Sequence, residues 1–276
     1  MPDETKVELG KVQQTLFFPL LARARESQSK RPLLRDPRAA ELVRAVGMDF
    51  TDYKTPMRIM VVMRTLVFDW WVRQFLAEHP AGTVVELGAG LNTRFERTDN
   101  GSAHWIDLDL PDTIELRRRF FTDTGRRRML TASLLGEDWV PEVEALPGPY
   151  FFVADGVLPY LTEDEVTSTL ARLAARFPGS KLAFDSYPRM ALEWEHKLAA
   201  KRDLAYWQWS CDDPRTLERY GLRLLESATT TRPPAGLLAT LPARYRYLLP
   251  LAYPVLGRGV SLNLFAAVPS APGQPG

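Results

Sequence analysis

The chain has 276 residues, of which 45% are hydrophobic and 25% are charged, so it is long enough to bury the core of one large domain. Its 35 basic and 34 acidic residues give a net charge of +1, which favours neither nucleic acid nor an acidic membrane surface as a partner. A small molecule is therefore the expected partner. The single cysteine, Cys211, excludes an internal disulfide and a cysteine-based metal cluster.

The chain carries no signal for a membrane or for secretion. No apolar run approaches the roughly 18 residues that a transmembrane helix needs, and the first residues are charged. We therefore expect a cytoplasmic protein, and the sequence indicates no oligomeric state. Because there is no internal repeat and no linker, residues 1–276 are predicted to form one domain. It would carry N-terminal helices over about 11–76 and an insertion over about 186–213.

The segment 83–94, TVVELGAGLNTR, predicts a buried strand followed by a glycine-rich turn and the start of a helix. Val84 and Val85 supply the β-branched apolar residues of a parallel strand, and Gly88 and Gly90 allow the backbone to approach a ligand closely. This is the first turn of a doubly wound sheet, in which ligands bind beyond the carboxyl ends of the strands.

The residues around this turn favour one cofactor over another. A dinucleotide fingerprint, GxGxxG, would have its third glycine where Thr93 stands. Glu86 lies two residues before the first glycine, where a carboxylate suits a cation or an ammonium and would repel a pyrophosphate. S-adenosylmethionine carries both a sulfonium and an ammonium, so a methyltransferase is favoured over a dehydrogenase. A turn without any ligand is the alternative that the glycines alone leave open.

A second strand is predicted over 104–111, HWIDLDLP, where polar and apolar residues alternate. It ends in Asp109, about twenty residues past the turn, where nucleotide-binding folds place the acid that holds ribose hydroxyls. Pro111 is typical of a first helical position. The arginines that follow, in IELRRRFFTDTGRRR, are predicted to form a solvated helix face rather than a phosphate site.

Three motifs, ELGAGLNTR, WIDLDLP and ADGVLPYL, in this order and spacing resemble the leucine carboxyl methyltransferase family. The resemblance is greatest to its bacterial branch of tetracenomycin-type polyketide O-methyltransferases, and it covers about residues 17–268. It implies a class I methyltransferase fold, α/β and Rossmann-like, with a doubly wound, mostly parallel sheet of seven strands. It also implies S-adenosylmethionine as the cofactor and O-methyl transfer as the reaction.

The resemblance also implies roles for single residues. Arg64, on an apolar helix predicted over 57–76, would reach the methionine carboxylate of the cofactor, with a structural ion pair as the alternative. Ser133, at the end of a third strand predicted over 129–134, stands where the wider family has an aspartate that reads the adenine. The predicted cofactor-binding residues are Arg64, Glu86, Gly88, Ala89, Gly90, Thr93, Arg94, Asp107, Asp109, Leu110, Ser133, Leu134, Asp155 and Gly156.

The insertion over 186–213 is rich in aromatic residues and is predicted to be a lid over the substrate, because ring faces accept flat apolar ligands. A pair of packing helices is the alternative. Tyr160, which follows the fourth predicted strand, is expected at the substrate, with a core position as its alternative. The predicted substrate-binding residues are Tyr160, Tyr187, Trp194, Trp207 and Trp209.

The acceptor atom decides whether a base is needed. A carboxylate is already ionised at neutral pH, whereas a phenol with a pKa near 10 needs a base. His196 and Tyr160 are the catalytic candidates, although a surface position is the alternative for His196. The leucine-specific members of the family hold their substrate carboxylate with an arginine where Leu135 stands here, so a protein C-terminus is not the expected substrate.

We therefore expect an S-adenosylmethionine-dependent O-methyltransferase that acts on a small, aromatic or polyketide-like carboxylic acid. A phenolic hydroxyl is the alternative acceptor. A non-catalytic, cofactor-binding interaction protein is a further alternative. No metal ion is expected.

Overall fold

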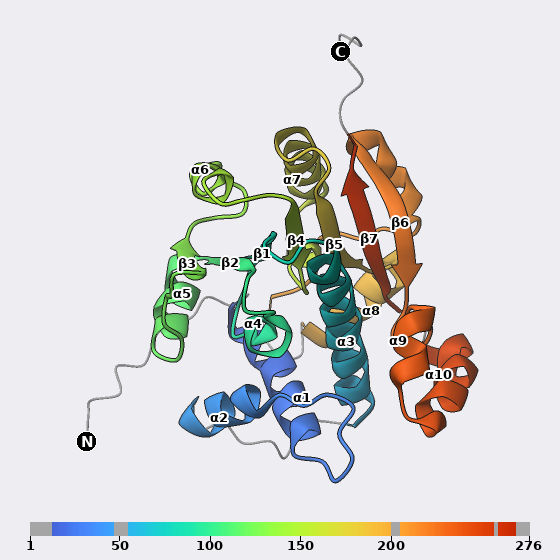
Figure 1. The fold of residues 1–276 in the computed structure, drawn as a ribbon. Coiled ribbons are helices and arrows are strands. Elements are labelled where there is room, and N and C mark those ends of the chain that lie inside the picture. Colours follow the sequence, from blue (N-terminus) through green and yellow to red (C-terminus); the bar gives the residue numbers. More distant parts are fainter. Residues whose placement is uncertain (1–12, 47–54, 200–204, 257–258, 269–276) are drawn as a thin grey trace.

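The computed structural model describes residues 13–46, 55–199, 205–256 and 259–268 (Figure 1). Seven strands form one sheet in the order β3-β2-β1-β4-β5-β7-β6. The strands are β1 Thr83–Leu87, β2 His104–Asp109, β3 Arg127–Thr131, β4 Tyr150–Ala154, β5 Lys181–Ser186, β6 Leu222–Ala228 and β7 Ser261–Ala267. Only β7 runs antiparallel to its neighbours, β5 and β6. The predicted doubly wound, mostly parallel sheet is confirmed.

Helices cover both faces of the sheet and one of its ends (Figure 1). The helices are η1 Gln13–Leu16, α1 Phe17–Ser27, α2 Pro37–Val46, α3 Thr55–Glu78, α4 Arg94–Thr98, α5 Pro111–Arg118, α6 Val140–Glu144, η2 Leu158–Tyr160, α7 Glu163–Arg176, α8 Arg189–Ala199, η3 Pro214–Tyr220, α9 Ala235–Thr240 and α10 Ala243–Leu256. The helices α9 and α10, between β6 and β7, were not predicted. Pro242 and Pro250 interrupt the helical pattern of that segment.

Alternation along the strands builds two cores, one on each face of the sheet. Val85 and Phe152 point to the face that α7 covers, whereas Val84 and Phe151 point to the face that α3 covers. Because α3 is buried along most of its length, the apolar run predicted over 57–76 becomes the central helix of one face. The N-terminal helices α1 and α2 form a third cluster with α5 and β3.

Two local features bear on the ends of the strands and helices. The helix α7 begins with a capping box, in which the Thr162 hydroxyl accepts from the Glu165 N–H and the Glu165 carboxylate accepts from the Thr162 N–H. The third strand ends at Thr131 rather than at residue 134, so Ser133 lies in the loop beyond the strand.

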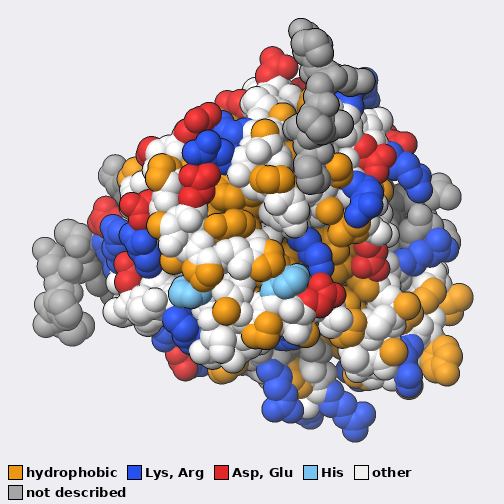
Figure 2. Space-filling view, turned by 45° about the horizontal axis from the view of Figure 1, so that its top comes forward, with side chains coloured by type: hydrophobic (Ala, Val, Ile, Leu, Met, Phe, Trp, Pro, Cys, Tyr) orange, Lys and Arg blue, Asp and Glu red, His pale blue; other side chains and the backbone are white. Residues whose placement is uncertain are grey.

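The surface agrees with the balanced composition. On the face that Figure 2 shows, basic and acidic side chains are interspersed with apolar ones instead of gathering into a single charged patch. Within the described part of the chain, no helix is both long and apolar enough to cross a membrane. The same residues contain no group of three or more His, Cys, Asp or Glu side chains arranged to hold a metal ion.

Candidate cofactor and acceptor site

A cavity of about 480 Å³ lies beyond the carboxyl ends of β1, β2 and β4, and η1, α1, α3 and α8 contribute to its walls. We call it the cofactor cavity. The predicted residues that line it are Arg64, Gly88, Ala89, Gly90, Asp109, Leu110, Ser133, Leu134, Asp155, Gly156, Tyr160, Tyr187, Trp194 and Trp207. Its position is the one at which doubly wound sheets bind their ligands.

The glycine turn is shaped by two close approaches. Gly88 has φ +70°, and a Cβ there would lie 2.5 Å from Cγ2 of Val157 in the turn after β4. Gly90 has φ +48°, and its N–H donates to Oδ2 of Asp109 at 2.7 Å. A side chain at either position would strain the backbone, because both have positive φ. The turn therefore brings its backbone to the cavity without a side chain in between.

Asp109 ends β2 and faces the cofactor cavity. Its two oxygens accept the N–H groups of Gly90 at 2.7 Å and Leu110 at 2.8 Å, which fixes the carboxylate in place. Burial raises the pKa of Asp109, although these two N–H donors oppose the shift. Each carboxylate oxygen can accept more than one hydrogen bond, so Asp109 can still bind ligand hydroxyl groups.

Arg64 reaches the cavity from α3 and is held by two acids. Its Nε lies 2.7 Å from Oδ1 of Asp155, and its Nη1 lies 3.0 Å from Oδ2 of Asp185 and 3.1 Å from the Tyr187 hydroxyl. Burial lowers the pKa of Arg64. Asp155, Tyr187 and Asp185 raise it by a larger amount, so the pKa lies well above its ordinary value. Its side chain keeps 13% exposure. The structural ion pair and the position at the cofactor site thus occur together.

Arg23 of α1 is a second cationic side chain in the cavity wall, and it was not among the predicted cofactor-binding residues. It is 3% exposed, and its guanidinium binds Asp36 at 3.0 Å and the Leu91 carbonyl at 2.9 Å. Its signal in the sequence is weak but real, because it lies three residues after the buried Leu20 and so on the inner face of the helix. Two guanidinium groups, rather than one, are therefore available to an anionic part of the ligand.

Three predicted residues, Glu86, Arg94 and Thr93, lie beneath the cavity and do not line it. Arg94 is fully buried and binds Glu86 at 2.6 Å, Asp69 at 2.9 Å and Asp155 at 2.9 Å. Thr93 donates its hydroxyl to Asp36 at 2.6 Å. The arginine at the start of α4 neutralises the acid of β1, so the structure replaces the expected contact of Glu86 with the cofactor by an internal ion pair.

These charges form one connected group, which we call the ion-pair network. Arg97 joins its two halves, because it binds Asp69 at 2.7 Å through Nε and Asp36 at 3.0 Å through Nη1. The members of the network are Arg23, Asp36, Arg64, Asp69, Arg73, Glu86, Arg94, Arg97, Asp155 and Asp185. Of these, Arg23, Arg64 and Asp155 also line the cofactor cavity.

Asp107 and the arginines around it require a correction. Asp107 is 1% exposed and binds Arg117 at 2.9 Å and Arg127 at 2.7 Å, so it does not reach the cofactor cavity. These two arginines were predicted on a solvated face, yet they are 1% and 3% exposed and lie over the Phe121 ring at 4.4 and 4.8 Å. A buried acid in β2 and an aromatic ring draw them inward.

Aromatic residues surround the far end of the cavity, which we call the acceptor end. The rings of Tyr187 and Trp207 have centroids 3.9 Å apart, and Trp194 is 66% exposed at the rim. Burial raises the pKa of the Tyr160 hydroxyl, against the opposing effect of its hydrogen bonds with Thr15 and Trp207. Tyr160 therefore stays protonated at neutral pH, so it is placed as a polar contact and not as a base.

Two predicted residues of the lid lie elsewhere. His196 is exposed, and its Nε2 hydrogen bonds with the Trp207 carbonyl, outside the cavity wall. Trp209 is 1% exposed and packs near Phe184, with ring centroids 6.5 Å apart. The expected substrate contact of Trp209 is thus replaced by a core position. The neighbouring Glu195, which was not predicted, does line the acceptor end.

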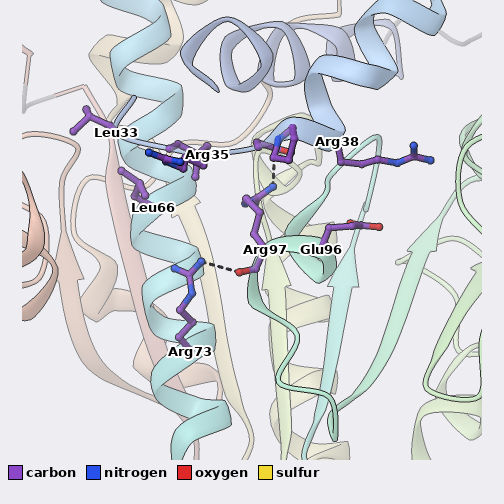
Figure 3. Close-up of a pocket in the computed structure, with 10 residues that line it drawn as sticks. Leu33, Arg35, Arg38, Leu66, Arg73, Glu96 and Arg97 are labelled. Atoms are coloured by element: carbon purple, nitrogen blue, oxygen red, sulfur yellow. Dashed lines mark hydrogen bonds and ion pairs between the residues drawn. The ribbon is translucent and has the colours of Figure 1, made fainter. Parts of the chain in front are cut away.

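A second cavity, of about 420 Å³, lies between α2, α3 and α4 (Figure 3). It is lined by Arg35, Arg38, Arg73 and Arg97 together with Asp36, Glu96 and apolar residues. Its acids are already engaged, since Asp36 binds Arg97 at 3.0 Å and Glu96 binds Arg127 at 2.6 Å. Neither the glycine turn nor any strand-end acid reaches it, so the chemistry is placed in the cofactor cavity.

Comparison with known proteins decides the family. Residues 17–174, more than half of the chain, match the leucine carboxyl methyltransferase family. The chain belongs to this family. Its members are S-adenosylmethionine-dependent methyltransferases, so this protein is a transferase with that cofactor. The cavity fits such a group, because it offers a strand-end carboxylate for hydroxyl groups, a bare glycine turn and two guanidinium groups.

Two relatives span most of this chain. It is 36% identical over 230 residues to "Tetracenomycin polyketide synthesis O-methyltransferase TcmP" of Streptomyces glaucescens, covering 80% of this chain and 83% of the relative. It is 28% identical over 250 residues to the S-adenosyl-L-methionine-dependent methyltransferase dpfgK of Gibberella zeae, covering 81% of this chain and 84% of the relative.

Two solved structures share the fold at low sequence identity. A duf574 family protein from Streptomyces avermitilis matches with a TM-score of 0.55 and 12% identity, over 90% of this chain and 96% of that one. Magnesium protoporphyrin IX methyltransferase from Synechocystis, solved with bound SAH, matches with a TM-score of 0.50 and 13% identity, over 82% and 93%. These likenesses support the class I methyltransferase fold alone.

Proposed function

We propose that this methyltransferase transfers a methyl group to a carboxylate oxygen of a small, flat, polyketide-like aromatic acid. The observation that carries the proposal is the acceptor end, where the aromatic side chains of Tyr160, Tyr187 and Trp207 line the cofactor cavity. Such walls suit a flat aromatic ligand. The 36% identical relative is named as a polyketide synthesis O-methyltransferase, which supports the same class of acceptor.

We assign the cofactor contacts from the cavity wall. Asp109 would accept hydrogen bonds from the ribose hydroxyls, and the loop that contains Ser133 and Leu134 would contact the adenine. Arg64 and Arg23 would hold the methionine carboxylate, whereas Asp155 would face the ammonium. When bound, S-adenosylmethionine supplies the electrophilic methyl group. The work of the protein is then to orient an oxygen nucleophile and to exclude water.

A carboxylate acceptor agrees with the groups found at the acceptor end. It needs no base, because it is ionised at neutral pH. Tyr160 keeps its proton there, since burial raises its pKa, and His196 lies outside the wall. Neither predicted catalytic candidate is therefore placed to remove a proton.

A phenol is the second candidate acceptor, and one observation favours it. Glu195 is a carboxylate at the acceptor end, and a carboxylate there can take the proton of a phenol as its oxygen is methylated. A carboxylate acceptor and a phenol acceptor predict different effects of pH, and of a substitution at Glu195, on the rate of methyl transfer.

The test uses two probes of the same skeleton, 2-naphthoic acid and 2-naphthol, each incubated with methyl-labelled S-adenosylmethionine. Mass spectrometry separates the labelled methyl ester from the labelled methyl ether. We expect the ester, with a rate that is flat from weakly acidic to neutral pH. Formation of the ether alone, with a rate that climbs into the alkaline range, would contradict the proposal. Cofactor binding without turnover on these or other aromatic acids and phenols would favour a non-catalytic role.

A further inference from the structure

Glu195 contributes a carboxylate to the acceptor end. The residue lies on the inner face of α8, four positions after Ala191, which packs against the core. Its Oε2 accepts the backbone N–H of Trp207 at 3.1 Å. Among the described residues, no hydrogen bond or ion pair engages its Oε1. A carboxylate accepts up to about four hydrogen bonds, so Glu195 has unused acceptor capacity next to the ligand.

The side chain is held in place by a well-anchored neighbour. Trp207 receives contacts from several directions, because its ring packs on Tyr187, its side chain hydrogen bonds with Tyr160 and its carbonyl binds His196. Glu195 is tied to the backbone of this tryptophan, so its carboxylate is fixed relative to the aromatic walls. A fixed acceptor can discriminate between ligands, whereas a mobile surface carboxylate cannot.

The acceptor end is also electrically polarised. Tyr160 lies where both charges act on it: besides burial, the Glu195 charge raises the pKa of its hydroxyl and the Arg64 charge lowers it. Arg64 is paired with Asp155 and Asp185, whereas no ion pair among the described residues engages Glu195, so the negative charge of Glu195 is the one open to a ligand. An aromatic acid fits this field when it carries a hydrogen-bond donor on the Glu195 side.

We propose that Glu195 accepts a hydrogen bond from a hydroxyl group of the acceptor, at a position other than the methylated oxygen. The preferred substrates are then hydroxylated aromatic acids. This inference rests on the proposed function, because it takes the acceptor to be an aromatic acid. A ligand without the hydroxyl would make no hydrogen bond with this half-buried carboxylate and would bind more weakly.

The matched variant is Glu195→Gln. A glutamine keeps one oxygen that can accept the Trp207 N–H, but it presents an amide N–H₂ donor where the carboxylate presented an acceptor. The control is Glu193→Gln, which makes the same charge change on the exposed side of the same helix. The probes are 2-naphthoic acid and its 3-hydroxy, 6-hydroxy and 6-methoxy derivatives.

Binding is measured by calorimetry in the presence of S-adenosylhomocysteine, so that no turnover is required. We expect the parent and Glu193→Gln to bind at least one hydroxy acid about tenfold or more tightly than 2-naphthoic acid, and the methoxy acid more weakly than the hydroxy acid. In Glu195→Gln we expect the hydroxyl preference to fall to about threefold or less. With turnover, KM for the hydroxy acid should rise while kcat changes little.

Equal hydroxyl preference in the parent and in Glu195→Gln would overturn the proposal, as would no preference for any hydroxy acid in the parent. Methylation of the ring hydroxyl, with a large loss of kcat in Glu195→Gln, would assign Glu195 as a base instead. Failure of the proposed function is distinguished by the product. If no methyl ester forms but the hydroxyl preference in binding falls as expected in Glu195→Gln, the proposed function is wrong and the role of Glu195 in binding is retained. Retained S-adenosylhomocysteine binding shows that the variant is folded.

Discussion

Asp69, a buried acid of the ion-pair network, and Asp109, a half-buried acid in the wall of the cofactor cavity, have pKa values shifted in opposite directions. Asp69, in the network, binds Arg97 and Arg94, whose charges outweigh the effect of burial and lower its pKa. Among the residues that the structure describes, Asp109, in the wall, is hydrogen bonded by backbone N–H groups alone, and burial raises its pKa. One carboxylate is neutralised inside the protein, whereas the other is left for a ligand.

The difference separates stability from function among residues that look alike in the sequence. An acid that is paired internally contributes to folding, and an acid held unpaired in a cavity does so less, because its charge is poorly solvated. Strained or unpaired groups of this kind concentrate at functional sites. For Asp69 and Asp109 the direction of the pKa shift follows this difference, whereas Glu86, in the network, has a raised pKa and Asp155, which belongs to the network and also lines the cavity, has a lowered one.

The largest expected effect is on the network. Arg94→Leu leaves the carboxylates of Asp69, Glu86 and Asp155 without a shared cation, so we expect a loss of about 3–5 kcal/mol in the free energy of unfolding. Denaturant unfolding measures it. Arg128→Gln is the control, because its ion pair with Glu142 is exposed, at 44% and 47%, and should contribute at most about 1 kcal/mol. Similar losses in both variants would refute the contrast.

The second prediction separates binding from folding by pH. The pKa of Asp69 is lowered, so its stabilisation is present above the unfolded value near 3.9 and is lost as pH falls through the folded value. The pKa of Asp109 is raised, so its contribution to stability runs the other way: it is present below about 3.9 and is lost as pH rises through the folded value.

Acidification should thus protonate Asp109 before it unfolds the network. We expect S-adenosylhomocysteine affinity to weaken at a pH where the circular dichroism is still that of the folded protein. Titrations of affinity and of circular dichroism between pH 7 and pH 3 measure the two events. If affinity holds constant until the protein unfolds, the role assigned to Asp109 is wrong.

The smallest effect is expected at His196. Its ring lies outside the cavity wall, so His196→Ala should change the free energy of unfolding by no more than about 0.5 kcal/mol and leave the methyl transfer rate nearly intact. Steady-state kinetics with an aromatic acid that the parent protein methylates measure this rate. A fall of about 10²–10⁴-fold would instead identify His196 as a general base.

The sequence predicted the sheet well because periodicity and the glycine turn are local signals. Strand-end residues such as Asp109, and turn residues such as Gly88 and Gly156, line the cavity as expected. Their position follows from chain topology, since the carboxyl ends of parallel strands meet at one edge.

The ion pairs between distant segments could not be predicted from the sequence. Glu86 and Asp107 lie within strands, at positions where helix arginines can reach them, and only the packed structure shows that Arg94, Arg117 and Arg127 do so. The predicted lid was harder still, because Glu195 and His196 are neighbours on one helix, about 100° apart around its axis, and only the structure shows that Glu195 lines the cavity and His196 does not. A count of aromatic residues could not distinguish a core ring from a wall ring.

The most direct test of the assigned cavity is calorimetric titration of S-adenosylhomocysteine into the parent, Asp109→Asn and Glu115→Gln. Glu115 is 68% exposed on α5 and serves as the matched charge control. We expect one site per chain in the parent and the control, no comparable binding of NAD, and a loss of about 1.5–3 kcal/mol in Asp109→Asn, which is roughly 10–150-fold. Equal affinity in Asp109→Asn, with the fold retained, would contradict the placement of the cofactor at the end of β2.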